Sequence, residues 1–141
     1  MKRDKEGFLY PAVDEQKCVS CQRCGQVCPL KKGTIFQKRH RYYGAVNRDQ
    51  SVRKRSSSGG VFSLLADYVL HKSGSVFAAG YDPEMNVVHM EITDAKELDR
   101  VRRSKYVQSD TGMIFRKIRA RLEEGGWVLF TGTPCQAEAL R

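Results

Sequence analysis

The sequence predicts two parts of different fold class: a small α+β module at the N-terminus, followed by a partial α/β domain with a largely parallel sheet. Three observations support this division. Four cysteines lie within residues 18–28, basic residues gather in 31–55, and helical and strand patterns alternate from residue 56 onward. We expect a cysteine module over residues 1–32, a basic connector over residues 33–55, and the first part of an α/β domain over residues 56–141.

The composition excludes several classes of protein. With 40% hydrophobic residues among 141, the chain is able to build a packed core. No apolar run reaches the roughly 18 residues that a membrane helix needs. The charged N-terminus has no apolar stretch behind it, which predicts a cytoplasmic protein without a secretory signal. Five cysteines in such a chain indicate metal or redox chemistry rather than disulfides.

The cysteine run has the spacing of an iron–sulfur ligand set. Cys18, Cys21, Cys24 and Cys28, followed by Pro29, form the pattern C-x2-C-x2-C-x3-C-P of bacterial ferredoxins. Structural zinc, the alternative, usually takes two cysteine pairs separated by a long loop. The run therefore predicts a ferredoxin-like module with a 4Fe-4S cluster.

The fourth cysteine leaves two arrangements open. In two-cluster ferredoxins the last cysteine of a run ligates the other cluster. Either Cys28 closes the same cluster, or a second run precedes this sequence and residues 1–32 are the second half of a two-cluster module. We favour the second arrangement, because residues 5–11 resemble the strand and turn that link two such runs.

The connector carries most of the positive charge. Residues 31–55 hold nine basic side chains and one acidic one, which gives +8 of the total +9. One interpretation is a solvated linker; the other is a positive surface for a cofactor phosphate, a polyacidic coenzyme tail or an acidic redox partner. Nucleic acid is disfavoured because no reader motif accompanies the charge.

The α/β part shows a regular succession of elements. Apolar residues at helical spacing, ended by glycines, predict two longer helices, and apolar or alternating runs predict three strands. Asp94 and Glu97 have capping-box spacing and predict a short helix through Val101. The predicted helices are 61–69 and 114–122, the strands are 76–80, 88–92 and 127–130, and a last helix starts near Ala137. Because the chain stops as that helix begins, we expect a fragment of a longer protein.

Three polar segments of this part are candidate binding sites. Residues 47–60, which end in Ser-Ser-Ser-Gly-Gly at 56–60, lead into a helix and suit an anion, although an ordinary serine cap gives the same pattern. Residues 103–109 form a polar stretch between helices. This stretch suits hydrogen bonding and ring stacking to a flat heterocycle, and it fits a surface loop equally well. Residues 131–136 follow a strand and open a helix, where Cys135 suits metal ligation or redox work unless it is a buried structural cysteine. His40, His71 and His89 are expected to be surface or strand residues rather than ligands.

Four blocks in this order resemble the N-terminal part of the beta-subunit family of coenzyme F-420 hydrogenases and dehydrogenases. They are residues 44–49, residues 52–53 together with 56–62, residues 104–109 and residues 129–136, preceded by the ferredoxin-type run. The resemblance implies a flavoprotein subunit that holds FAD beside 4Fe-4S clusters and transfers electrons between the clusters and a flavin or deazaflavin. It implies redox partners such as a ferredoxin or hydrogenase or dehydrogenase subunits.

The resemblance also implies roles for particular residues. Ser58, Gly59 and Gly60 would approach the FAD phosphates, and Cys135 would ligate a further cluster whose other cysteines are absent from this sequence. Four more residues are assigned to the cofactor: Lys105, Tyr106, Gln108 and Thr133. The chain alone is expected to be inactive as an oxidoreductase. The alternative function is a non-catalytic iron–sulfur binding or assembly module with a basic docking surface.

Overall fold

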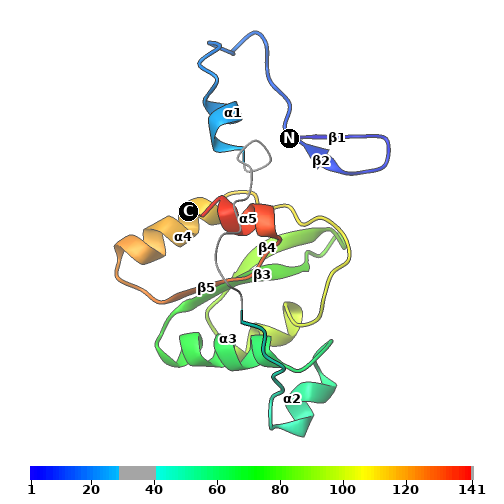
Figure 1. The fold of residues 1–141 in the computed structure, drawn as a ribbon, viewed down its shortest axis with the longest axis vertical. Helices are drawn as coiled ribbons and strands as arrows, with labels where there is room; N and C mark the ends of the chain where they lie inside the picture. The colour runs from blue at the N-terminus through cyan, green and yellow to red at the C-terminus, as the bar shows by residue number, and fades with distance from the viewer. Residues whose placement is uncertain (29–40, 141) are drawn as a thin grey trace. The chain divides into compact units, whose positions relative to one another are not determined.

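The computed structural model describes residues 1–28 and 41–140, and the chain divides into two compact units. One unit comprises Met1–Arg39 together with Thr133–Arg141, and the other comprises His40–Gly132. Figure 1 labels the helices and strands of both. Among the described residues, no helix has the length and apolar character needed to cross a membrane.

The His40–Gly132 unit is built on a three-stranded mixed sheet in the order β4-β3-β5. Strand β3 (Ser75–Tyr81) pairs antiparallel with β4 (Val87–Ile92) and parallel with β5 (Val128–Phe130). The three predicted strands are therefore confirmed, but the largely parallel sheet is wrong. Residues 82–86 join β3 to β4, and a link of this length makes a hairpin, whereas a parallel crossover needs about a dozen residues or more.

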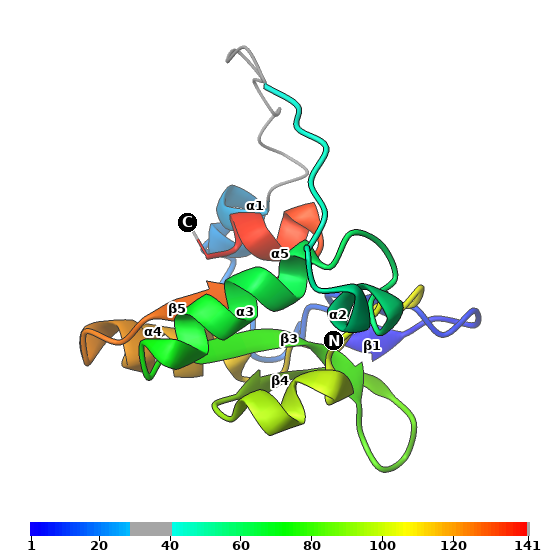
Figure 2. The same cartoon turned by 90° about the horizontal axis from the view of Figure 1, so that it is seen from below.

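Helices cover both faces of this sheet. Helix α3 (Val61–His71) and the 3-10 helix η1 (Ala95–Arg100) pack on one face, and α4 (Ile114–Glu123) packs on the other. Figure 1 shows α3 below the sheet and α4 above it, and Figure 2 looks onto the α3 side. The alternation of β3 supplies both cores, because neighbouring residues of a strand point to opposite faces.

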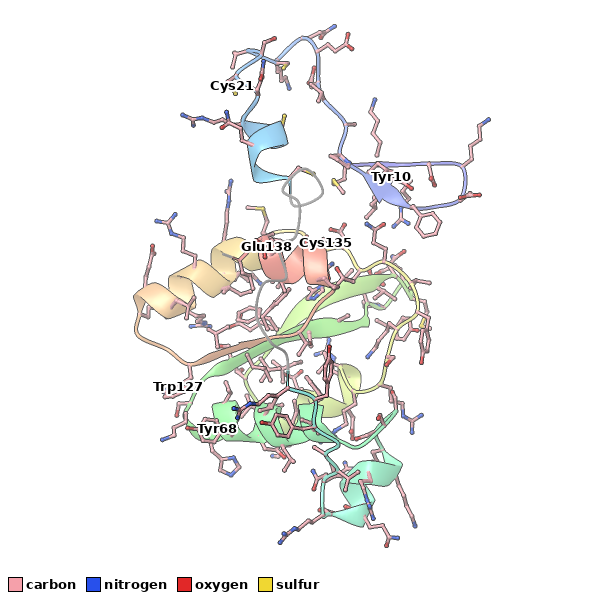
Figure 3. The ribbon with its side chains drawn as sticks, viewed as in Figure 1. Tyr10, Cys21, Tyr68, Trp127, Cys135 and Glu138 are labelled. Atoms are coloured by element: carbon pink, nitrogen blue, oxygen red, sulfur yellow. The ribbon has the colours of Figure 1, made fainter. Side chains whose placement is uncertain are left out.

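The two core clusters are fully apolar. Val76 and Ala78 face α3, while Phe77, which has no exposed surface, faces α4. Figure 3 labels an exposed aromatic pair, Tyr68 and Trp127, whose rings meet edge to face with centroids 5.8 Å apart. The buried members of the first cluster are Ala66, Val69, Val76, Ala78, Ile92, Leu98 and Val101, and those of the second are Phe77, Ile114 and Ile118.

Two short helices differ from the expectation. The helix after Asp94 is a 3-10 helix. The Asp94 carboxylate caps it by accepting the Lys96 N–H at 2.9 Å. Glu97 pairs with Arg100 at 2.6 Å, which corrects the predicted capping-box role of Glu97. Within the predicted connector, residues Gln50–Lys54 form helix α2, capped by the Asp49 carboxylate. Hydrogen bonds from Ser51 and Val52 to this carboxylate lower the pKa of Asp49.

The other unit contains little regular structure. Strands β1 (Lys2–Arg3) and β2 (Leu9–Tyr10) form an antiparallel hairpin, and α1 (Arg23–Val27) contains Cys24. Helix α5 (Pro134–Glu138) begins before the predicted Ala137, because Thr133 stands at its N-cap and donates its N–H to the Gln136 side chain at 2.9 Å. Residues 29–32 of the predicted module and 33–40 of the connector, including His40, lie outside the described residues.

Candidate functional site

A pocket of about 370 Å³ lies within the His40–Gly132 unit. Its walls come from the loop before α3, the start of α3, the segment after η1 and the residue that follows β5. Thr131 therefore places the pocket at the carboxyl end of β5, where open α/β sheets bind ligands. The lining residues are Ala45, Ser56, Ser57, Ser58, Gly59, Gly60, Val61, Phe62, Val101, Arg102, Arg103, Ser104 and Thr131.

The start of α3 forms one wall of this pocket. Gly60 is the N-cap in a left-handed conformation (φ 77°), and no side chain of the described residues caps the helix. The free N–H groups of the first turn and the positive end of the helix dipole lie beside three serine hydroxyls. Such a wall favours an anionic group of a ligand.

Close backbone packing supports the glycine-rich loop. The Asn47 N–H donates to the Gly59 carbonyl at 2.6 Å, and Asn47 is buried. A Cβ added at Gly59 would lie 2.4 Å from the Ala45 carbonyl oxygen. The loop therefore needs glycine at this position in order to lie against residues 45–47.

A buried arginine holds the opposite wall. The Arg102 side chain is only 8% exposed; its Nε donates to Ser63 Oγ of α3 at 3.1 Å, and its Nη1 pairs with Asp99. Asp99 also pairs with Arg55 at 3.4 Å. The hydrogen bond from Arg102 is the main cause that lowers the pKa of Asp99. These contacts tie the segment after η1 to both α3 and the loop before it.

Two further hydrogen bonds join the segment after η1 to the loop before α3. Arg103 Nε donates to the Arg55 carbonyl at 3.2 Å, and the Ser104 N–H donates to Ser57 Oγ at 2.9 Å. Arg103 has a positive φ of 69°, a conformation that costs a non-glycine residue energy and that the surrounding contacts must stabilise. The pocket thus combines a helix N-terminus with serine hydroxyls, a chemistry suited to phosphate oxygens, and the Arg102 and Arg103 side chains hold its wall in place.

The predicted cofactor residues separate into two groups. Ser58, Gly59 and Gly60 line the pocket, whereas Lys105, Tyr106 and Gln108 are not among its lining residues, and Thr133 belongs to the other unit. The Lys105 ammonium instead donates to the Arg102 carbonyl at 2.6 Å and to the Arg103 carbonyl at 3.2 Å. Partial burial lowers the pKa of Lys105. Tyr106 is 93% exposed.

The sequence reasoning missed Arg102. The polar stretch predicted from the sequence begins at Arg103, yet the buried guanidinium that organises the wall belongs to the residue before it. A signal was present, because Asp99 and Arg102 stand three residues apart, the spacing of a side-chain ion pair in a helical turn. Nothing in the local pattern indicated the second partner, Ser63, which lies 39 residues away.

The cysteine run lies in the other unit, in a loop with unusual backbone. All four thiols are free; Cys18, Cys21 and Cys24 are exposed and Cys28 is half-buried. Figure 3 labels Cys21 in this loop. Ser20 and Gln22 both have positive φ, and the Ser20 N–H donates to Cys18 Sγ at 3.4 Å. Within the described ranges, no three histidine, cysteine or carboxylate side chains are close enough to hold one metal ion.

The donor set nevertheless suits an iron–sulfur cluster. Free thiols are the ligands that such clusters take, and a backbone N–H directed at a ligand sulfur is the kind of contact that tunes a cluster's potential. In this structure the sulfurs are not gathered, so binding requires the loop to close around the cluster.

Cys135 lies in the first turn of α5. It is exposed rather than buried, and Figure 3 labels it on this helix. Its sulfur lies 3.1 Å from Thr133 Oγ1. A buried structural role for this cysteine is therefore wrong, while its predicted role as a cluster ligand stays a prediction.

Comparisons with protein-family models and with curated proteins find no match to this chain.

Proposed function

We propose that the chain is an iron–sulfur flavoprotein subunit that transfers electrons between 4Fe-4S clusters and a flavin or deazaflavin. The observation that carries the proposal is the run of four free thiols at ferredoxin spacing. Cys18, Cys21, Cys24 and Cys28 are the proposed ligands, with Cys135 as a ligand of a further cluster.

The pocket beside α3 is the proposed FAD site. Its volume of about 370 Å³ accepts part of such a molecule, and its serines and helix N-terminus suit the diphosphate. Ser58, Gly59 and Gly60 would approach the phosphates; by resemblance, Lys105, Tyr106 and Gln108 would serve the remainder of the cofactor. Bound flavin would supply exchange between two-electron and one-electron carriers. The proposed partners are a ferredoxin or other redox subunits.

Anaerobic reconstitution with iron and sulfide tests the cluster. The loaded protein is expected to be brown, to contain acid-labile sulfide and to lose visible absorbance on reduction. Cys21→Ser should remove most of the bound iron, whereas Val19→Ala, at an exposed residue of the same loop, should leave it unchanged. A colourless protein that takes up zinc stoichiometrically instead would reject the proposal.

Flavin binding tests the pocket separately. FAD is expected to bind more tightly than riboflavin, because only FAD carries the diphosphate that the α3 wall recognises. Gly59→Ala should weaken FAD binding, since its Cβ would meet the Ala45 carbonyl, while Gly44→Ala, whose Cβ meets no atom within 4 Å, is the matched control. Equal affinities for FAD and riboflavin would mean that this pocket does not bind the diphosphate.

A second candidate is an iron–sulfur binding or assembly module with a basic docking surface. Exposed basic residues on and near α2, Arg48, Arg53 and Lys54, favour it. Redox potentiometry separates the two functions: a bound cluster that is not reduced within an accessible range supports the assembly module.

A further inference from the structure

Lys105 contacts the wall of the pocket beside α3 without lining the pocket. It follows three consecutive residues that do line it, Arg102, Arg103 and Ser104. Its ammonium group donates to the Arg102 carbonyl oxygen at 2.6 Å and to the Arg103 carbonyl oxygen at 3.2 Å. The side chain therefore folds back on the wall segment that precedes it, and two of its three N–H donors are used there.

These two hydrogen bonds stabilise a half-buried charge. Burial lowers the pKa of Lys105, because the ammonium loses hydration in the folded chain. Among the ion pairs of the described residues, none involves Lys105. Its nitrogen lies 6.0 Å from the ring centroid of Tyr81, the last residue of β3. The two carbonyl oxygens and this ring therefore compensate for the hydration that the charge has lost.

The backbone that Lys105 holds is strained. Arg103 has a φ of 69°, in the left-handed region that a residue with a Cβ rarely adopts. The carbonyls of Arg102 and Arg103 belong to the peptide groups on either side of this residue, and its φ and ψ set their relative orientation. An ammonium group that bonds to both carbonyls therefore stabilises the strained conformation directly.

The conformation of Arg103 decides whether the wall meets the loop before α3. Arg103 Nε donates to the Arg55 carbonyl at 3.2 Å, and the next N–H, that of Ser104, donates to Ser57 Oγ at 2.9 Å. Ser57 and Ser104 line the pocket from opposite sides of this contact. If the turn at Arg103 relaxed, both bonds would be lost and the wall would separate from the serine–glycine loop.

We propose that Lys105 is a positioning residue of this pocket: its ammonium fixes the turn at Arg103 and so keeps the wall joined to the loop before any ligand binds. The role rests on the proposed flavin site, where a wall that is already in place reduces the ordering cost of binding. It differs from direct contact with the cofactor, because Lys105 acts through Arg103 and Ser104 while its donors stay on the two carbonyls.

Amide hydrogen exchange of the chain without cofactors, followed by NMR, tests the position of the wall. Lys105→Met removes the donors and is expected to speed exchange of the Ser104 amide at least about tenfold, while the amides of β3 stay within about twofold. Lys105→Arg keeps the charge and the donors and should restore most of the protection. An unchanged Ser104 amide in Lys105→Met, as expected for a residue that acts only by contact with the cofactor, would overturn the proposal. An equal rise in β3 would also do so, since it would show a general loss of stability.

FAD titration of the same variants tests the consequence for binding. Lys105→Met should weaken FAD binding about fivefold or more, and Lys105→Arg should recover most of the affinity. Lys72→Met is the matched control, because it removes the same charge from a lysine that lies 5.8 Å from the Tyr68 ring centroid, at the far end of α3 from the pocket; it should leave the affinity within about twofold.

The outcomes separate this proposal from the flavin site itself. Equal losses in the Lys105 and Lys72 variants would mean that FAD senses only net charge, and an unaltered affinity in Lys105→Met would mean that the wall does not matter for binding; either result would overturn the positioning role. If the native chain does not bind FAD while the Ser104 amide still responds to Lys105→Met, the proposed flavin site fails and the role of Lys105 in holding the wall is supported.

Discussion

The two units of this chain are stabilised in different ways. The His40–Gly132 unit contains all the buried apolar residues of the described chain, including Phe77, Ile92 and Leu98 with no exposed surface. Among residues 1–28 whose exposure is described, none is buried. Burial of apolar surface is the main source of folding free energy. The His40–Gly132 unit therefore has a core that stabilises it, whereas the described residues of the cysteine loop have none. A metal cluster is one way for such a segment to become ordered.

Substitution of Phe77 tests the contribution of the apolar core to the stability of the His40–Gly132 unit. Phe77→Ala is expected to lower the free energy of unfolding by about 3–5 kcal/mol, because it leaves a cavity between the sheet and α4. Urea titration followed by the fluorescence of Trp127 measures the loss. Val107→Ala, at a residue 62% exposed, should change it by less than about 0.5 kcal/mol. A Phe77 variant as stable as the native chain would contradict the assigned core.

Cluster loading tests whether the cysteine loop, residues 18–28, depends on a cluster for its order. Reconstitution with iron and sulfide should slow amide hydrogen exchange in residues 18–28 by about 100-fold or more, because cluster ligation restricts a loop that has no core of its own. Exchange in β3 and α4, which the apolar core already protects, should change little. Hydrogen-exchange mass spectrometry of the reduced apoprotein and the loaded protein gives both values. Equal protection of the loop before and after loading would show that it is ordered without a cluster.

The contact between Arg102, which follows η1, and Ser63 of α3 is expected to contribute less to stability than Phe77 does. Arg102→Ala should destabilise the chain by about 2 kcal/mol, because the buried Ser63 hydroxyl loses its partner and the guanidinium packing is lost. Arg100→Ala removes an exposed ion pair with Glu97 and should lower stability by about 0.5 kcal/mol. Thermal or urea unfolding compares them. Equal effects would mean that Arg102 does not hold the pocket wall.

Acid titration should give the smallest effect. Burial opposes ionisation of Glu91, but hydrogen bonds from Arg121 and Ser75 outweigh it and hold the pKa below its ordinary value of 4.5. Because the folded-state pKa is lowered, the contribution to stability is present above about pH 4.5 and is lost as the pH falls through the folded value. Glu91→Gln should lower stability at pH 7 by about 1 kcal/mol or less and flatten its dependence on pH below 5. Urea unfolding from pH 3 to 7 measures this, with the exposed Glu123→Gln as the control.

Much of the local structure was predictable because it depends on short spacings. Helical periodicity gave α3 and α4, and apolar runs gave β3, β4 and β5. The arrangement of the sheet was not predicted, because the residue patterns of β3 and β4 do not indicate whether the two strands pair parallel or antiparallel. The short link between these strands indicates an antiparallel pair. The candidate pocket was predictable in part. Its serine–glycine loop follows from the segment at residues 56–60, whereas Arg102 and Thr131 reach it only through the folded path of the chain.

The sequence alone determined the cysteine spacing, the basic character of residues 31–55 and the glycine loop before α3, since each is a property of neighbouring residues. Tertiary structure alone decided that Arg102 meets Ser63, that Ser104 meets Ser57 and that the His89 ring lies against Phe130. These pairs lie 39 to 47 residues apart or on different strands. Contacts at such separations depend on how the sheet and helices pack, and no short pattern in the sequence encodes them.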